Sequence, residues 1–276
     1  MNARIVLVHG LGRDLHDWDA VVPGLADVAE CTAVDLAGFG VEPPPPDARY
    51  GPEAHAARVA DRVLTGTGPV HLVGNSLGGL VSVLAAARHP EKVATLTLVA
   101  PALPLGGSTT GGRTLALLGV PAVGTALMRG ARGRDLERRT HDLLRLTFAR
   151  PGEVGPERMA ALRAAVEARD LVPHADDAFS ATVRAIALQL LRPGPVRRAV
   201  ASLRMPVTAL YGRHDRLVPV RHAVRFKRLL PAADVRVLQH AGHLIQLEDP
   251  SDVVAAVRRQ VTAYSHAVVS TPGEGA

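Results

Sequence analysis

The chain has 276 residues, of which 47% are apolar, 21% are charged and only 3% are aromatic, and its formal net charge is +6. The apolar fraction excludes an intrinsically disordered protein, and the length suits one catalytic domain with an insertion. Few aromatic residues and no recognisable nucleic-acid-binding module argue against a nucleic-acid partner. The arginine excess is therefore expected to be solvated surface, with attraction of an anionic substrate or an acidic lipid surface as the alternative; its densest cluster is Arg129, Arg132, Arg134, Arg138, Arg139 and Arg145.

The sequence gives no sign of export or membrane insertion. Its start lacks the charged and then apolar pattern of a signal peptide, and the longest apolar stretch, 115–128, is short and broken by glycine and proline. Cys31 is the only cysteine, so no intrachain disulfide can form. We expect a cytoplasmic protein without an integral membrane segment, and the sequence leaves its oligomeric state open.

Short apolar runs rich in valine and leucine predict the strands of a doubly covered parallel sheet. They span residues 4–8, 31–35, 70–73, 94–99, 207–211 and 235–238, and helix-like segments separate them. This alternation predicts an α/β fold, with a mostly parallel sheet of about six strands flanked by helices.

The turn after the first strand is His9-Gly10-Leu11-Gly12, and the second strand ends at Asp35. A glycine-rich turn followed by an acid at about this distance also occurs in nicotinamide-binding proteins. Leu15, however, stands where such a site has its third glycine. Cofactor binding is the weaker hypothesis, because it also leaves the later motifs unexplained.

The third strand leads through Gly74-Asn75-Ser76-Leu77-Gly78 into a helix. A sharp turn between strand and helix lifts a serine hydroxyl out of the sheet, where a base can activate it. The flanking glycines permit such a turn, since they tolerate strained dihedrals and close backbone contact. Ser76 is therefore the candidate nucleophile.

Residues 104–203 interrupt the alternation after the fourth strand. They begin with a glycine-rich stretch, 106–112, which suggests a flexible linker. The pattern that follows predicts helices at 113–128, 134–149, 156–169, 176–191 and 195–202, separated by prolines. We expect a helical insertion.

Asp215 follows the fifth strand and His243 the sixth, each in the loop at the strand's carboxyl end. The order serine, aspartate, histidine along the chain is that of one catalytic-triad design. Rival histidines lie within or beside other elements and are expected to be structural: His9, His71, His89, His214, His222 and His240. No metal is expected either, because the spacing of one possible ligand cluster fits no common signature: Asp14, His16, Asp17 and Asp19.

These motifs, with the 35–40 loop and with Glu248 and Pro250 after His243, resemble the α/β-hydrolase family. The resemblance implies a hydrolase core at 1–103 and 204–264 and a helical cap at 104–203, and the polar residues 265–276 are expected to form a flexible tail. Little chain precedes the first strand, so we expect a sheet without the family's N-terminal hairpin.

The resemblance also implies a mechanism. Ser76 would attack a carbonyl carbon, His243 would take its proton, and Asp215 would orient the imidazole. The backbone N–H groups of Leu11 and Leu77 would form the oxyanion hole. This mechanism requires no cofactor and no metal.

We expect a serine hydrolase that cleaves an apolar carboxylic ester of a small or acyl-chain substrate through an acyl-enzyme. Asn75 also resembles the elbow of carbon–carbon bond hydrolases that act on ring-fission diketones, although these usually carry tryptophan where this chain has Leu244. Cofactor-free haloperoxidase-like activity, lyase activity and a non-catalytic small-molecule receptor are further alternatives on the same constellation.

Overall fold

The computed structural model describes residues 3–66, 68–106, 120 and 123–270. Its sheet has six strands in the order β2-β1-β3-β4-β5-β6, and every neighbouring pair is parallel. This confirms the predicted α/β fold and its strands, which are β1 (Arg4–Val8), β2 (Glu30–Val34), β3 (Val70–Asn75), β4 (Val93–Val99), β5 (Val207–Gly212) and β6 (Asp234–Leu238).

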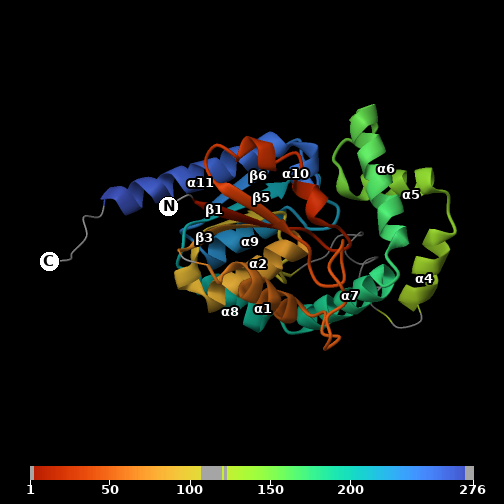
Figure 1. Cartoon of the computed structure of the whole chain (residues 1–276), viewed down its shortest axis with the longest axis horizontal. Coiled ribbons are helices and arrows are strands. Elements are labelled where there is room, and N and C mark those ends of the chain that lie inside the picture. Colours follow the sequence, from red (N-terminus) through yellow and green to blue (C-terminus); the bar gives the residue numbers. More distant parts are fainter. Residues whose placement is uncertain (1–2, 67, 107–119, 121–122, 271–276) are drawn as a thin grey trace.

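Helices cover both faces of the sheet (Figure 1). The α-helices of the described residues are α1 (Pro52–Val63), α2 (Leu77–Arg88), α4 (Val123–Arg132), α5 (Leu136–Thr147), α6 (Pro156–Leu171), α7 (Ala175–Leu191), α8 (Gly194–Ala201), α9 (Arg221–Leu229), α10 (Ile245–Glu248) and α11 (Pro250–Ser270). Four short 3-10 helices add to them: η1 (Leu15–Trp18), η2 (Val22–Gly24), η3 (Pro90–Lys92) and η4 (Pro151–Glu153).

The strands divide their side chains between two cores, as the period of two in a strand requires. Val6 and Val8 of β1 belong to the core shared with α1, α2, α8 and α9. Ile5 and Leu7 of the same strand belong to the core shared with η1 and α11. The four inner strands β1, β3, β4 and β5 are therefore buried on both faces, which explains their continuous apolar sequences.

The helices between β4 and β5 form the predicted insertion in chain order. In Figure 1, α4, α5 and α6 stand beyond one end of the sheet, opposite the end where β1 begins. A separate small core, formed by Leu144, Phe148, Leu162 and Leu244, joins α5 and α6 to the start of α10. By contrast, α8 packs against α2 in the main core. The division into core and cap at 104–203 stays a prediction.

Some predicted features fall outside the described residues or differ from the structure. Residues 107–112 of the predicted linker are not described, nor are 113–119 of the predicted helix 113–128; α4 begins at Val123 and continues to Arg132. At the other end of the chain, α11 extends to Ser270, past residue 265 where the tail is predicted to begin. No helix of the described residues is long and apolar enough to cross a membrane.

Candidate active site

Ser76 lies at the apex of a sharp turn between β3 and α2. Its φ of 52° and ψ of −113° are dihedrals that a residue with a Cβ rarely adopts. The main chain holds it there, because Ser76 N–H donates to the Val99 carbonyl at 2.9 Å while the Ser76 carbonyl accepts from the N–H groups of Leu80 and Ala102. The geometry is that of a nucleophile elbow.

Glycine is required where α2 passes β1. A Cβ on Gly78 would overlap the Val8 carbonyl and would come within 2.5 Å of the His9 carbonyl oxygen. The first turn of α2 can therefore press against the carboxyl end of β1 only because residue 78 has no side chain. This contact sets the elbow beside the turn that follows β1.

The turn after β1 is held by a neutral histidine. His9 is fully buried, its Nε2 accepts the Leu36 N–H at 2.9 Å, and its Nδ1 lies 2.7 Å from the Gly10 carbonyl oxygen. Nδ1 must therefore carry the proton, and burial lowers the pKa of His9. Asp35 Oδ1 lies 3.7 Å from Nε2 but forms no true ion pair, because that nitrogen is an acceptor.

The Gly10–Gly12 turn lies directly beside Ser76. A Cβ placed on Gly10 would be 3.4 Å from the Ser76 Cβ. Leu77 is the first residue of α2, so its N–H has no acceptor within the helix. The N–H groups of Leu11 and Leu77 thus belong to two neighbouring turns, the arrangement that an oxyanion hole requires.

Asp215 and His243 are in direct contact. His243 Nδ1 lies 2.8 Å from Asp215 Oδ2, and both side chains are almost fully buried. The other oxygen, Asp215 Oδ1, accepts the N–H groups of Leu217 and Val218 at 2.7 and 2.8 Å. A carboxylate oxygen accepts, so Nδ1 is the donor, and no hydrogen-bond partner of Nε2 is found in the part of the chain that the structure describes.

The elbow and His243 meet through Asn75. Its Nδ2 donates to the Val99 carbonyl at 3.1 Å and to the His243 carbonyl at 3.3 Å. Among the described residues, no hydrogen bond joins the Ser76 hydroxyl to the imidazole. The structure thus brings Asp215 to the His243 ring and the His243 carbonyl to the elbow, but it does not join the Ser76 hydroxyl to the ring. In serine hydrolases such a contact often tightens only when substrate is bound.

Three other side chains that the sequence singled out, Asp35, Asp17 and His71, have partners away from the Asp215–His243 pair. Asp35 accepts the N–H groups of Leu15 and Val41, so both its oxygens serve the loops around it. Asp17 pairs with Arg13 and accepts from Gln246. His71 bonds to Thr95 inside the sheet at 2.9 Å. Each of these side chains has a structural role that accounts for it.

Three arginines of the arginine-rich segment form ion pairs with aspartates of the insertion. Arg132 pairs with Asp176 at 2.7 Å and Arg139 with Asp170 at 2.6 Å. Arg134 pairs with Asp142 at 3.3 Å. These pairs favour the interpretation as solvated surface over a dedicated anion-binding patch.

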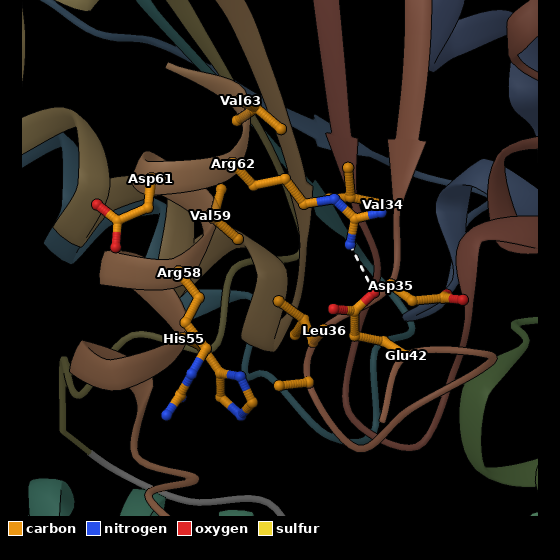
Figure 2. A pocket seen from close by; sticks show the side chains of 11 residues that line it. Val34, Asp35, Leu36, Glu42, His55, Arg58, Val59, Asp61, Arg62 and Val63 are labelled. Atoms are coloured by element: carbon orange, nitrogen blue, oxygen red, sulfur yellow. Dashed lines mark hydrogen bonds and ion pairs between the residues drawn. The ribbon is translucent and has the colours of Figure 1, made fainter. Parts of the chain in front are cut away.

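A cavity of about 300 Å³ lies between the end of β2 and α1 (Figure 2). None of the predicted site residues lines it, and Arg62 and Glu42 form an ion pair at 2.6 Å across its edge. His55, which contributes to the lining, is fully buried and has no partner for either ring nitrogen among the described residues. Burial lowers the pKa of His55 to about 4, so the ring is neutral at physiological pH.

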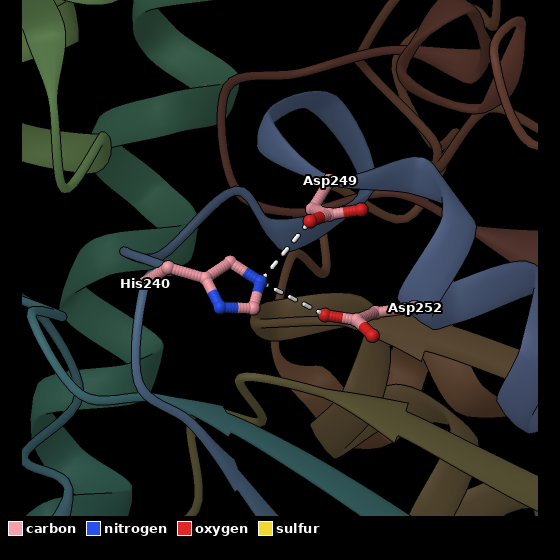
Figure 3. A group of neighbouring side chains, drawn as sticks. All are labelled: His240, Asp249 and Asp252. Atoms are coloured by element: carbon pink, nitrogen blue, oxygen red, sulfur yellow. Dashed lines mark hydrogen bonds and ion pairs between the residues drawn. The ribbon is translucent and has the colours of Figure 1, made fainter.

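Figure 3 shows the group of side chains most suited to holding a cation among the described residues. His240 Nε2 lies 3.0 Å from Asp249 Oδ2 and 3.2 Å from Asp252 Oδ2. All three are partly exposed, and both carboxylates stand at the start of α11, where negative charge is favourable. The contacts of the His240 ring with these two carboxylates tie the loop after β6 to the start of α11.

The parallel sheet, the strained serine turn and the buried aspartate–histidine pair define an α/β hydrolase. The family described as alpha/beta hydrolase fold matches residues 3–250, and the chain belongs to it. The pimeloyl-[acyl-carrier protein] methyl ester esterase of Methylococcus capsulatus is 34% identical over 244 residues, which cover 87% of either protein.

Other relatives have different chemistries. The 2-hydroxy-6-oxo-2,4-heptadienoate hydrolase of Pseudomonas putida is 28% identical, over 88% of this chain and 83% of its own. The structure of a 2-hydroxy-6-oxo-6-phenylhexa-2,4-dienoate hydrolase from Rhodococcus has the same fold, with a TM-score of 0.76 at 20% identity, over 95% of this chain and 91% of that one.

Some curated relatives are much longer than this chain. It spans 43% of the biotin biosynthesis bifunctional protein BioHC of Teredinibacter turnerae, to which it is 30% identical over 92% of its own length. It spans 63% of the dihydrolipoyllysine-residue acetyltransferase component of an acetoin cleaving system from Cupriavidus necator.

Proposed function

We propose that this α/β hydrolase is a serine esterase that cleaves the carboxylic ester of a small or acyl-chain substrate. The observation that carries the proposal is the Asp215–His243 pair, whose free imidazole nitrogen belongs to a loop hydrogen-bonded to the residue before Ser76. A strained serine beside a buried, oriented base is the arrangement that acyl transfer needs.

The proposed steps of ester hydrolysis use Ser76, His243 and two backbone N–H groups. His243 Nε2 removes the proton of the Ser76 hydroxyl as its oxygen attacks the ester carbonyl carbon. The N–H groups of Leu11 and Leu77 stabilise the oxyanion, and the alcohol leaves with the proton from His243. Water, activated by the same nitrogen, then hydrolyses the acyl-enzyme and releases the acid.

The esterase relatives support an ester substrate, and the name of one of them supports an acyl chain. A methyl ester of a carrier-bound acyl chain is therefore a sensible first substrate to test.

A carbon–carbon bond hydrolase is the second candidate. Asn75 supports it, because this residue before the serine resembles the elbow of such hydrolases, and one relative carries the name of such an enzyme. Assay of ring-fission diketones beside esters on the same sample distinguishes the two, since only one class should be turned over efficiently.

The central experiment is the Ser76→Ala variant assayed on short and long acyl esters. Loss of a triad nucleophile should reduce kcat at least about 10³-fold while the circular dichroism spectrum stays unchanged. A folded variant that keeps most of its activity would show that Ser76 is not the nucleophile. A wild-type protein that binds esters without multiple turnover would instead favour the receptor alternative.

A further inference from the structure

One turn of the insertion contacts both loops that carry the aspartate–histidine pair. This turn, residues 147–150, runs from the last residue of α5 to the residue before η4. The carbonyl of Thr147 accepts the His243 N–H at 2.6 Å and the Leu244 N–H at 3.3 Å. Arg216, the residue after Asp215, donates through Nη1 to the carbonyls of Phe148 and Arg145 at 2.6 and 2.8 Å.

Glu248 binds the His243 loop to the same turn. One carboxylate oxygen, Oε2, accepts the Gly242 N–H at 2.6 Å, and the other, Oε1, accepts the Ala149 N–H at 2.6 Å. Hydrogen bonds to an ionised carboxylate are about twice as strong as neutral ones. A single side chain therefore joins the residue before His243 to a residue almost a hundred positions earlier in the chain.

The 147–150 turn and the loop around His243 are also closely packed. A Cβ on Gly242 would lie 2.5 Å from the Thr147 carbonyl oxygen and 2.7 Å from the Ala149 nitrogen. On the other side, Leu244 is buried with Leu144 and Phe148. Residues 242–244 are thus enclosed between the turn and Glu248, which leaves little room for the His243 ring to shift.

We propose that Glu248 is a positioning residue, which uses the 147–150 turn of the insertion to fix His243 in the place where it can serve as the base. This inference rests on the proposed function, because it assigns to the insertion a part in catalysis. It accounts for why both carboxylate oxygens of Glu248 are spent on backbone donors rather than on a basic side chain.

Glutamine at position 248 provides a sharp test. Gln has almost the same shape, but only one of its two terminal atoms accepts a hydrogen bond, so one of the N–H groups of Gly242 and Ala149 would face another donor. Misplacement of a catalytic group by about 1 Å can cost about 100-fold in rate. We expect Glu248→Gln to lower kcat about 10- to 100-fold, with KM changed less than about threefold.

The matched control is Glu153→Gln. Glu153 lies in η4, close in sequence to the turn, and its exposed carboxylate pairs only with Arg150 among the described residues. Glu153→Gln removes the same charge as Glu248→Gln, but kcat should be unaltered. Glu248→Asp is the second variant; it keeps the charge but is too short to reach both N–H groups, so its kcat should also fall.

Hydrogen exchange of the backbone amides supplies a readout that needs no turnover. In the folded Glu248→Gln protein, exchange should speed up together at 147–150 and at 242–244, while α2 keeps its protection. A kcat that falls only in proportion to the folded fraction, or unchanged exchange at 242–244, would overturn the inference. If no ester is turned over by the wild type but the two segments still loosen together, the link through Glu248 stands and the esterase proposal fails.

Discussion

At the scale of single residues, Ser76 shows how the site departs from relaxed geometry. Its positive φ is adopted by few residues that carry a Cβ, and such a conformation costs about 1–3 kcal/mol. The hydrogen bonds of its N–H and carbonyl to the neighbouring chain hold it in place. The fold therefore stores strain at the one hydroxyl that the proposed chemistry uses.

The strain can be measured with two inactive variants. Ser76→Gly relieves it, whereas Ser76→Ala keeps the Cβ that causes it, so the glycine variant should have a free energy of unfolding about 1–2 kcal/mol higher than the alanine variant. Urea unfolding followed by circular dichroism provides both values. An alanine variant that is more stable than the glycine variant would show that the turn is unstrained.

Asp215 can be tested without disturbing its backbone contacts. In Asp215→Asn the carbonyl oxygen can still accept the N–H groups of Leu217 and Val218, but the amide nitrogen then faces His243 Nδ1. Because the amide nitrogen is a donor, His243 Nδ1 must become the acceptor, and the ring proton moves to Nε2. A protonated Nε2 cannot take the proton of the Ser76 hydroxyl. We expect kcat to fall about 10³- to 10⁴-fold at pH 7. Activity within tenfold of the wild type would remove Asp215 from the mechanism.

At the scale of elements, the packing of α2 against β1 positions the elbow beside the Gly10–Gly12 turn. Gly78→Ala places a methyl group against two carbonyl oxygens of the backbone, which cannot move aside as a flexible side chain would. We expect a loss of about 2 kcal/mol or more in the free energy of unfolding. Thermal and urea unfolding measure this loss.

Gly130→Ala is the control for this substitution. Gly130 lies in α4 and has nothing within 4 Å of an added Cβ. The same chemical change should there be neutral or stabilising by up to about 1 kcal/mol, because alanine favours a helix. Equal destabilisation at both positions would mean that the close approach of α2 to β1 is not what requires glycine at 78.

Elements could be predicted well where local pattern decides them. Each strand was expected within two residues of its observed bounds, since a short valine-rich run between turns has few alternatives. The end of α4 lies at Arg132 instead of the expected residue 128, because propensity alone does not fix where a helix of the insertion ends. The hydrogen-bond partners of Glu248 could not be predicted either. The sequence singles out this residue, but its contact with Ala149 exists only in the folded chain.

At the scale of the whole molecule, two buried histidines make stability depend on pH. Burial lowers the pKa of both His55 and His71 to about 4, from an ordinary value of 6.5. Between these values the unfolded chain binds protons that the folded chain does not. The contribution of the two neutral histidines to the free energy of unfolding is therefore complete above pH 6.5. It is lost as the pH falls toward 4, at up to about 1.4 kcal/mol per pH unit for each histidine.

Urea unfolding at pH 7.5, 6.0 and 5.0 tests this dependence. The free energy of unfolding should decrease toward pH 5.0. The decrease should be smaller in His55→Leu, because the leucine side chain cannot bind a proton in the unfolded chain. His55 is the better choice for substitution, because neither ring nitrogen has a partner to lose among the described residues. Parallel pH profiles for the two proteins would contradict the expected pKa of His55.

The molecule as a whole was predictable because its motifs follow the strands of a parallel sheet. Ser76, Asp215 and His243 each lie in a turn or loop that follows a strand, and parallel strands bring such loops to one edge. The same reasoning could not foresee how the insertion meets that edge, since the contact of Thr147 with His243 depends on tertiary packing. Nor could it show that the Ser76 hydroxyl lacks a bond to the imidazole among the described residues.

The most direct test of the account is reaction of the folded protein with a fluorophosphonate, followed by mass spectrometry of its peptides. A nucleophilic serine activated by His243 predicts one adduct, on Ser76, which is absent from the Ser76→Ala variant and strongly slowed in Asp215→Asn. An adduct on another residue, or no adduct on a protein shown to be folded, would contradict the assignment of Ser76 as the nucleophile.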